Sequence, residues 1–467
     1  MSVLVYFAAS AAAIGGFLFG YDMGAISGVL IMGPFEDRFG YAHNSFLEGF
    51  IVSSFVLGCF FGSLAASYLA DHFGRKVSII IGGAMFTIGG ALQASSFEIG
   101  QLLVGRIVAG LAVGVLSMVV PLYQSEIAPK EIRGTLVSMQ QLAISIGIFV
   151  SFLINLECVK IEGEASWRIP LGIQCIPAAT LALVMLLLPK SPRWLISQGR
   201  TDEAMEVLCK FAPHPEEEMK EMHEAICLEQ KMEKLSWSEL LEPNLRRRVL
   251  IGVAIQAFQQ LTGIIAVMYY APTIFQSAGF VGSTAQLTAT AINGAVNVFM
   301  AIPAVIYVDR LGRRPLLLFG AALMALTMVL VGALIAIFAP RNFDDKSAGY
   351  ATIALIYMFV AFFTCTWGPI GWIYPSEIYS TRLRAKCMGV TTASNWAFNF
   401  IVALVVPPLI NSISWGLYIM FGACDILMLL FVYFFIPETK GRSLEQIDHM
   451  FGGRVNVEEK VKFEMVC

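Results

Sequence analysis

The sequence predicts an all-α membrane protein with twelve transmembrane helices in two six-helix halves, joined by a helical linker. Of the 467 residues, 57% are hydrophobic and only 14% are charged, whereas soluble domains carry about 25% charged residues. Twelve apolar runs reach the length of about 20 residues that a helix needs to cross a bilayer. Short motifs also recur on either side of one long polar stretch, which indicates a duplicated unit.

The expected spans follow from the apolar runs and lie near residues 4–28, 46–70, 77–97, 100–122, 134–156, 168–188, 248–271, 285–308, 315–338, 351–374, 387–411 and 414–436. An even number of spans places both termini on one side of the membrane. The short loops on that side hold ten Lys and Arg residues, against five in the opposite loops. Because basic loops stay in the cytoplasm, we expect a multi-pass plasma-membrane protein with both termini cytoplasmic.

The polar stretch from about 197 to 248 interrupts the apolar pattern. Its apolar residues recur at roughly helical spacing, at Met219, Met222, Ile226 and Met232. This spacing predicts amphipathic helices on the cytoplasmic face that touch the bundle, with a solvated linker as the alternative. The chain is therefore divided into a first half, a linker, a second half and a cytoplasmic tail, at residues 1–190, 191–247, 248–437 and 438–467.

Three pairs of motifs recur in the same order in the two halves. DHFGRK at 71–76 matches DRLGRR at 309–314, YQSEIAPKEIRG matches YPSEIYSTRLRA, and LPKSPR at 188–193 matches IPETKG at 436–441. The near-constant separation of these pairs predicts a six-span unit repeated in parallel orientation. Two such halves are typical of membrane proteins that rock about a site at mid-membrane.

Several classes of function find no support in the sequence. The nine cysteines are scattered without a CxxC pair, so a disulfide framework and a metal site are not expected. The sequence contains no recognisable catalytic nucleophile or phosphate-binding loop, so enzyme activity and an organic cofactor are not expected. A nucleic-acid partner is not expected either. The functional unit is expected to be a monomer. The first apolar run begins almost at Met1 without a basic flank, which argues against a cleavable signal peptide and indicates trimming at the N-terminus.

Asp22 is an ionisable residue inside the first apolar run, in FLFGYDMGAISG. Such a residue costs from a few to roughly ten kcal/mol at membrane depth and is therefore a functional candidate. Its expected partner is Arg106, in the fourth run. Beside an arginine the carboxylate is favoured as an anion, and desolvation or separation favours proton uptake. The alternative is a static ion pair that orients two helices. For Asp425, in the last run, we expect a wet crevice or a helix contact.

Amide side chains are unusually frequent inside the predicted spans. They both donate and accept hydrogen bonds, but at membrane depth they are costly unless they line a cavity or bond between helices. The candidates at these depths are Gln141, Gln256, Gln259, Gln260, Asn293, Asn297, Asn395 and Asn399. As a set, they suit a ligand that carries several hydroxyl groups.

Eight motifs together resemble the sugar porter family of the major facilitator superfamily, over residues 17–441. They are FGYD, DxxGRK, PLYxSE…RG, QQLTGI, DRLGRR, WGPIGWIYPSE, SNWAFNF and PETKG. The resemblance implies the major facilitator fold and proton-coupled import of a monosaccharide, hexose or pentose, by alternating access. A passive sugar facilitator and a transporter-like sugar sensor are the alternatives. Asp22 matches the proton symporters, since passive members carry Asn at this position, and the short tail argues against a sensor.

The resemblance also implies site residues. The sugar-binding set is Gln141, Gln259, Gln260, Asn297 and Asn395, with Trp372 stacking under the ring. Ile265 stands where the family usually has an Asn that reaches the sugar. An unpaired hydroxyl in a dry site costs about 1–3 kcal/mol. We therefore expect weaker binding of a standard hexose, or a preference for a pentose, a deoxysugar or a substituted sugar.

Gating residues complete the expectations. By resemblance, a cytoplasmic charge network is closed in the outward-facing state and broken in the inward-facing state. Its members are Arg75, Glu126, Arg133, Arg313, Arg314, Glu377 and Arg384. Lys190 departs from the family, which has Glu there. Tyr269 and Tyr270 are expected to form an outer gate or a membrane-interface aromatic belt. Gly368-Pro369 and Pro407-Pro408 are expected to be flexible points or simple kinks.

Overall fold

The computed structural model describes residues 3–41, 44–127, 133–211, 215–231, 243–280, 282–341, 346–379 and 381–440. Within these ranges every regular element is a helix, and no strand is present. Twelve spans are long and apolar enough to cross a membrane, and each overlaps one of the runs predicted from the sequence. The predicted all-helical, twelve-span fold is therefore confirmed.

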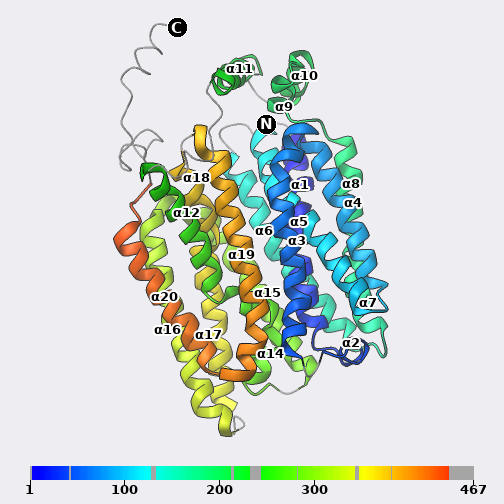
Figure 1. Cartoon of the computed structure of the whole chain (residues 1–467), viewed down its shortest axis with the longest axis vertical. Helices are drawn as coiled ribbons and strands as arrows, with labels where there is room; N and C mark the ends of the chain where they lie inside the picture. Colours follow the sequence, from blue (N-terminus) through cyan, green and yellow to red (C-terminus); the bar gives the residue numbers. More distant parts are fainter. Residues whose placement is uncertain are drawn as a thin grey trace.

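The first half holds six of these spans (Figure 1). They are α1 (Val3–Val29), α3 (Ser45–His72), α4 (Arg75–Ala94), α5 (Ile99–Ile127), α6 (Arg133–Cys158), and the pair α7 (Ala165–Ile173) and α8 (Cys175–Leu187). The short α2 (Gly33–Phe39) connects α1 to α3. Only the last span is divided in two, between Ile173 and Cys175.

The second half repeats this plan with two broken spans. Its helices are α12 (Pro243–Leu261), α13 (Ile264–Tyr269), α14 (Ala271–Ser277), α15 (Ser283–Leu311), α16 (Arg313–Phe338), η2 (Ala339–Arg341), α17 (Lys346–Cys365), α18 (Trp367–Ile378), α19 (Thr381–Ile413) and α20 (Gly416–Phe435). The break between α12 and α13 falls at Gly263, whose φ of 93° is a left-handed conformation that glycine adopts readily. The break between α17 and α18 falls at Thr366, just before the predicted Gly368-Pro369, whereas Pro407 and Pro408 lie inside an unbroken α19.

Three linker helices lie together at the end of the bundle where α1 starts (Figure 1): α9 (Pro192–Ser197), α10 (Thr201–Phe211) and α11 (Pro215–Lys231). We call this the linker end, and the opposite end, with α2 and α14, the far end. On α11, Ile226 is buried, and Met219 and Met222 pack against the buried core. The predicted amphipathic linker is therefore observed. Met232 lies outside the described residues.

Glycines bring α1 into backbone contact with α6. A Cβ on Gly20 would lie 2.0 Å from the carbonyl oxygen of Ile144, and one on Gly24 would collide with the Ser151 hydroxyl. Two residues along a helix correspond to a rotation of about 200°. Asp22 therefore lies on the face of α1 opposite the glycines, away from α6.

The two halves meet at backbone distance toward the far end. A Cβ on Gly49, at the start of α3, would lie 2.4 Å from the carbonyl oxygen of Leu404 on α19. A Cβ on Gly294 of α15 would lie 3.1 Å from the Cα of Phe149 on α6. Contacts this close leave no room for solvent, so the halves are closed against each other at the far end.

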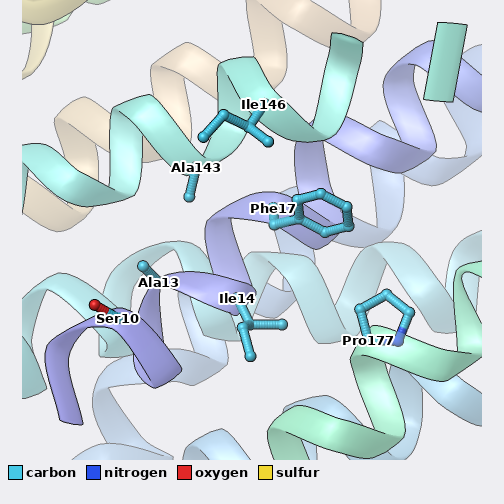
Figure 2. Close-up of a pocket in the computed structure, with 7 residues that line it drawn as sticks. All are labelled: Ser10, Ala13, Ile14, Phe17, Ala143, Ile146 and Pro177. Atoms are coloured by element: carbon cyan, nitrogen blue, oxygen red, sulfur yellow. The ribbon is translucent and has the colours of Figure 1, made fainter. Parts of the chain in front are cut away.

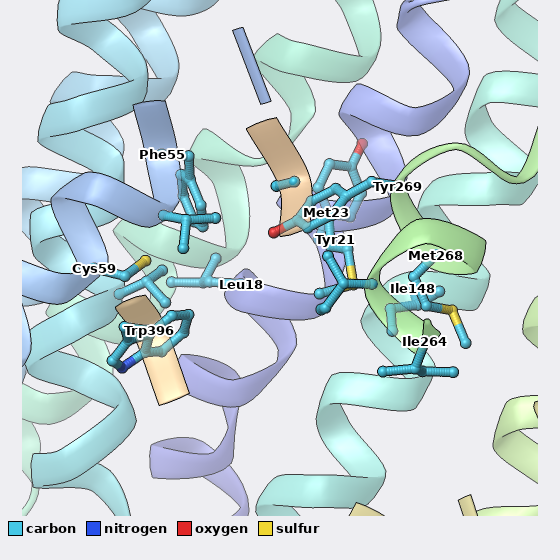
Figure 3. Close-up of a cluster of buried hydrophobic side chains, with 14 of the residues drawn as sticks. Leu18, Tyr21, Met23, Phe55, Cys59, Ile148, Ile264, Met268, Tyr269 and Trp396 are labelled. Atoms are coloured by element: carbon cyan, nitrogen blue, oxygen red, sulfur yellow. The ribbon is translucent and has the colours of Figure 1, made fainter. Parts of the chain in front are cut away.

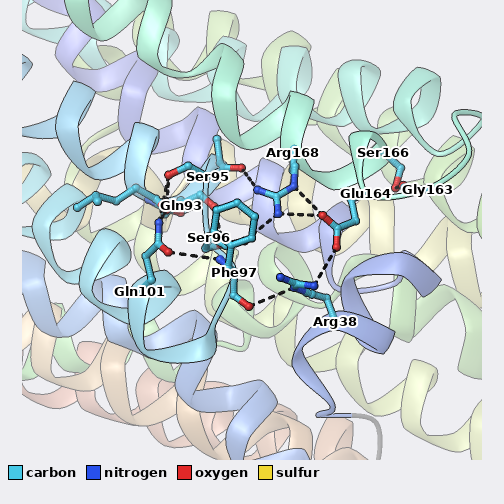
Figure 4. Close-up of polar contacts among 12 residues, drawn as sticks. Arg38, Gln93, Ser95, Ser96, Phe97, Gln101, Gly163, Glu164, Ser166 and Arg168 are labelled. Carbon is cyan, nitrogen blue, oxygen red and sulfur yellow. Dashed lines mark hydrogen bonds and ion pairs between the residues drawn. The ribbon is translucent and has the colours of Figure 1, made fainter.

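A polar clasp, made of Arg38, Glu164 and Arg168, fastens the far end of the first half (Figure 4). Glu164 Oε2 lies 2.9 Å from Arg168 Nη2, and Glu164 Oε1 lies 3.4 Å from Arg38 Nη1. Both arginines also donate to backbone carbonyls at the end of α4 and in the α4–α5 loop, at distances from 2.7 to 3.1 Å. The clasp joins α2, the α4–α5 loop and α7, and its pairing was not predicted from the sequence.

Candidate functional site

The structure brings Asp22 and Arg106 together inside the first half. Asp22 Oδ2 lies 3.4 Å from Arg106 Nη2, and both side chains are completely buried. Asp22 Oδ1 has no hydrogen-bond partner in the part of the chain that the structure describes. The carboxylate is thus held by one long contact, and its second oxygen is unsatisfied.

Arg106 connects four helices through its guanidinium. Besides Asp22 on α1, it donates to the carbonyl oxygens of Ile51 and Val52 on α3 and to Gln93 Oε1 on α4. It also lies 5.4 Å from the ring centroid of Phe55. Arg106 thus has partners on α3 and α4 besides Asp22, whereas Arg106 is the one hydrogen-bond partner that the described residues give to the Asp22 carboxylate.

Apolar side chains from both halves surround this stretch of α1 (Figure 3). Leu18, Tyr21 and Met23 of α1 lie in one buried cluster with residues of α3, α13 and α19. Across the boundary between halves, the ring of Phe19 packs edge-on against Trp396, with centroids 5.4 Å apart. The segment that carries Asp22 therefore touches the other half, so a change at Asp22 can reach the contact between halves.

Two of the predicted sugar-binding amides of the second half, Gln259 and Asn395, form a bonded group. Gln259 Nε2 donates to the carbonyl oxygens of Trp367 and Gly368, at 2.9 and 3.0 Å, where α18 begins. Asn395 Nδ2 donates to Gln259 Oε1 at 2.9 Å and also to Gln256 Oε1. The group joins α12, α18 and α19. It includes Gln256, to which no motif assigned a role.

The other predicted sugar-binding residues have different surroundings. Asn297 Oδ1 accepts hydrogen bonds from Thr364 Oγ1 at 3.0 Å and from Ser145 Oγ of the other half at 3.4 Å. Gln260 is buried, and its Oε1 finds no partner among the described residues. The other three residues of the predicted set differ in burial. Ile265 is buried on α13, whereas Gln141 and Trp372 are half-buried. Their roles in sugar binding stay predictions.

The predicted charge network consists, where described, of one brace in each half. In the first half Arg75 Nη2 lies 3.0 Å from Glu126 Oε1, and the Ser191 hydroxyl donates to Glu126 Oε2. In the second half Arg313 Nη2 lies 2.7 Å from Glu377 Oε1, and the Thr439 hydroxyl donates to Glu377 Oε2. These braces join helices of the same half. Arg133 and Arg384, the other predicted members of the network besides Arg314, have side chains outside the described residues.

The braces differ at one matched pair of positions, Lys190 and Glu438. Glu438 accepts hydrogen bonds from the backbone N–H groups of Arg313 and Arg314, both at 3.0 Å, and so caps the start of α16. Lys190 instead lies 5.6 Å from the ring centroid of Trp194. Because Lys190 replaces the glutamate that the family has at this position, the start of α4 lacks, among the described residues, the acidic cap that Glu438 gives to α16. Arg314 also donates to the carbonyl oxygen of Tyr433 at 2.7 Å.

Hydrogen bonds and burial act in opposite directions on Glu438. Burial alone would raise its pKa, but donors at the N–H groups of Lys440, Arg313 and Arg314 favour the carboxylate. The balance holds the pKa of Glu438 below its usual range.

Tyr269 and Tyr270 are both buried, at 0% and 1% exposure. Tyr270 donates its hydroxyl to the carbonyl oxygen of Ala403 at 2.6 Å, and the Tyr269 hydroxyl has no partner among the described residues. Side chains this buried do not belong to a lipid-facing aromatic belt. Their position beside the contact between halves favours the outer-gate alternative.

Two other features lie apart from these residues. A crevice of about 300 Å³ is lined by apolar side chains of α1, α6 and α8, with Ser10 as its polar member (Figure 2). Such a lining suits a lipid chain better than a polyhydroxyl ligand. Asp425 is fully buried on α20, and neither carboxyl oxygen has a partner within the described ranges. Of the two alternatives expected for it, this burial agrees with a helix contact and not with a wet crevice. No cluster of metal-ligating side chains occurs in the described part of the chain.

Two helical halves with ion-paired and amide-bearing side chains buried between their helices define a membrane transporter. Comparison with known proteins agrees with this class. The family model described as "Sugar (and other) transporter" matches residues 8–451. The chain belongs to this sugar transporter family of the major facilitator superfamily; it is a multi-pass membrane protein that transports sugar and is not an enzyme.

Relatives and solved structures match along nearly the whole chain. "MFS glucose transporter mfs1" of Aspergillus flavus is 38% identical, over 96% of this chain and 89% of its own length. "High-affinity glucose transporter 1" of Candida albicans is 36% identical, over 97% and 86%. The xylose transporter XylE from E. coli, in a partially occluded inward open conformation, gives a TM-score of 0.81 at 29% identity, over 95% of this chain and all of that one.

Proposed function

We propose that this protein imports a monosaccharide together with a proton, by alternating access across the plasma membrane, with both termini in the cytoplasm. The observation that carries the proposal is the buried Asp22–Arg106 pair. An acid at membrane depth is costly, and this one keeps an unsatisfied oxygen beside its arginine. That arrangement suits a group that binds and releases a proton.

Proton binding at Asp22 changes the interactions between α1 and α5. Protonation removes the charge that attracts Arg106, which remains bonded to α3 and α4. The segment around Asp22 packs against α13 and α19 of the other half (Figure 3). Loosening α1 therefore alters the contact between halves, which is how a proton would bias the rocking motion.

The monosaccharide is a hexose or a pentose. Curated relatives at 36–38% identity are named glucose transporters, and the solved structure of a proton:xylose symporter holds 6-bromo-6-deoxy-D-glucose. Ile265 in the predicted set cannot pair with a hydroxyl. We therefore propose either weaker binding of a standard hexose or a preference for a pentose, a deoxysugar or a substituted sugar.

We infer an inward-facing conformation from the closed far end. The basic loops predict that the linker end is cytoplasmic, so the closed far end is extracellular. A likeness to the inward open xylose transporter supports this reading. The Arg75–Glu126 and Arg313–Glu377 pairs, expected to break in an inward-facing state, are intact. Each pair joins helices of one half, so we propose that it holds that half rigid while the halves move relative to each other.

Sugar uptake into proteoliposomes tests the proton coupling. With a proton gradient directed inward, wild-type protein should accumulate sugar above equilibrium, up to about tenfold per pH unit if one proton accompanies each sugar. Asp22→Asn should abolish accumulation and keep sugar exchange, because asparagine cannot titrate. Asp425→Asn is the matched control, since it removes another buried membrane acid, and it should keep accumulation.

Other outcomes separate the alternatives. Wild-type uptake that ignores the proton gradient would identify a passive facilitator and refute the coupling. Wild-type protein that binds sugar but exchanges none would favour a sensor.

A further inference from the structure

A polar stripe runs along one face of α15. Its members recur at intervals of three or four residues and are all buried: Gln286, Thr290, Asn293 and Asn297. The opposite face carries exposed apolar side chains, Ile292 at 48% and Phe299 at 70%. A membrane helix with such a division turns its polar stripe toward the protein interior.

Asn293 is the exceptional member of this stripe. Gln286 and Thr290 donate to backbone carbonyls, and Asn297 accepts two hydrogen bonds. Asn293 is completely buried, yet neither its Oδ1 nor its Nδ2 has a partner among the described residues. An amide buried without bonds destabilises the conformation that contains it. The side chain therefore does not stabilise this state.

Asn293 lies where the two halves meet. The next residue, Gly294, packs against Phe149 and Phe152 of α6 in the other half. One turn along α15, Asn297 accepts a bond from Ser145 of α6. A motion that opens the far end must separate α15 from α6 here. That motion would make Asn293 accessible on the path from the far end to Asn297.

We propose that Asn293 is a specificity-determining residue that binds a sugar hydroxyl when the far end is open. This inference rests on the proposed function, because it concerns the same sugar. Asn293 and Asn297 are separated by about 6 Å along the helix axis, so the two amides can bind neighbouring hydroxyls of one ring. In this proposal Asn293 adds one amide to the predicted set, which has Ile265 where the family usually has an Asn.

Stability and sugar binding separate this role from a structural one. Replacing an unbonded buried amide by an apolar group of similar size is neutral or stabilising. Asn293→Leu should therefore keep or raise the melting temperature, while it raises the KM for sugar about tenfold. A structural role would lower stability and transport together.

Deoxysugars identify the hydroxyl concerned. Exchange of unlabelled and labelled sugar in proteoliposomes, without a proton gradient, is measured for the parent sugar and for each monodeoxy analogue. Asn293→Leu should weaken binding of the parent and leave one analogue, which lacks the contacted hydroxyl, unchanged. Asn155→Leu is the control, because the Asn155 amide donates to the carbonyl oxygen of Gly24 at 2.8 Å, within the first half. It should lower stability and affect every sugar alike.

A rescue variant tests the link to Ile265. Adding Ile265→Asn to Asn293→Leu should restore much of the lost affinity, and failure of this rescue would overturn the compensation. Equal losses for all analogues in Asn293→Leu, with wild-type exchange intact, would overturn the assignment of Asn293 alone. Wild-type vesicles that exchange no sugar would instead refute the proposed function.

Discussion

Exchanging the matched residues Lys190 and Glu438 tests how each half caps the N-terminus of the helix that carries its brace arginine, α4 in the first half and α16 in the second. Glu438 accepts two backbone hydrogen bonds at the start of α16. In the first half, no described residue accepts a hydrogen bond from the N–H groups of Arg75 or Lys76, where α4 begins. Lys190→Glu should therefore add a cap to α4, and Glu438→Lys should remove one from α16.

The size of the effect follows from the contacts involved. A side-chain cap contributes about 0.5–2 kcal/mol, and an acid near a helix N-terminus adds about 0.3–1 kcal/mol. Lys190→Glu also loses the contact with Trp194, worth about 0.5–1 kcal/mol at an exposed site. The expected net gain is about 1 kcal/mol, or about 2–4 °C in melting temperature for a unit the size of one half.

Thermal melting of the purified protein in detergent measures both substitutions. Lys190→Glu should raise the melting temperature, and Glu438→Lys should lower it by more than that gain, because two N–H groups lose an existing acceptor. A double variant carrying both exchanges should fall between the two. If Lys190→Glu lowered the melting temperature while Glu438→Lys left it unchanged, the capping argument would be wrong.

Four further substitutions test three separate features of the structure. Glu438→Gln should lower the melting temperature by a constant amount above about pH 5. The pKa of Glu438 in the folded protein lies below its unfolded value of 4.5, so the carboxylate stabilises the fold above pH 4.5, and this contribution is lost as the pH falls through the folded pKa. The melting temperatures of wild type and variant should therefore converge below the folded pKa. Gln256→Leu should lower the free energy of unfolding by about 1–3 kcal/mol, because Asn395 and the carbonyl oxygen of Gly371 each lose a hydrogen-bond partner. Gln260→Leu, which removes a side chain whose oxygen has no partner among the described residues, should lower it less in the same thermal melting experiment. Gly20→Ala should reduce folded yield in size-exclusion chromatography, because the added methyl would lie 2.0 Å from a backbone oxygen of α6; a normal yield would contradict the observed packing.

Sequence patterns predicted much of what is local or repeated. Apolar length alone located the twelve spans, since hydrophobicity is a property of each run. The residues of both arginine–glutamate braces lie in the duplicated motifs, as do Ser191 and Thr439, whose hydroxyls complete the braces. The resemblance predicted a charge network of these arginines and glutamates, and the structure showed which of them pair. The pairing of Asp22 with Arg106 followed from the cost of charge in a membrane.

Other pairings depend on how helices are rotated and shifted against one another, which local patterns do not contain. The clasp of Arg38, Glu164 and Arg168 joins segments far apart in sequence and belongs to no repeated motif. The binding of Asn395 to Gln256, and the lack of any bond at Asn293, likewise depend on helix register. By itself, the sequence determined the spans, their duplication and the chemistry of the buried charges, because these depend on residue type and spacing. Only the tertiary structure decided which buried amides satisfy one another and which are left unsatisfied, because a hydrogen bond needs its two atoms within about 3 Å.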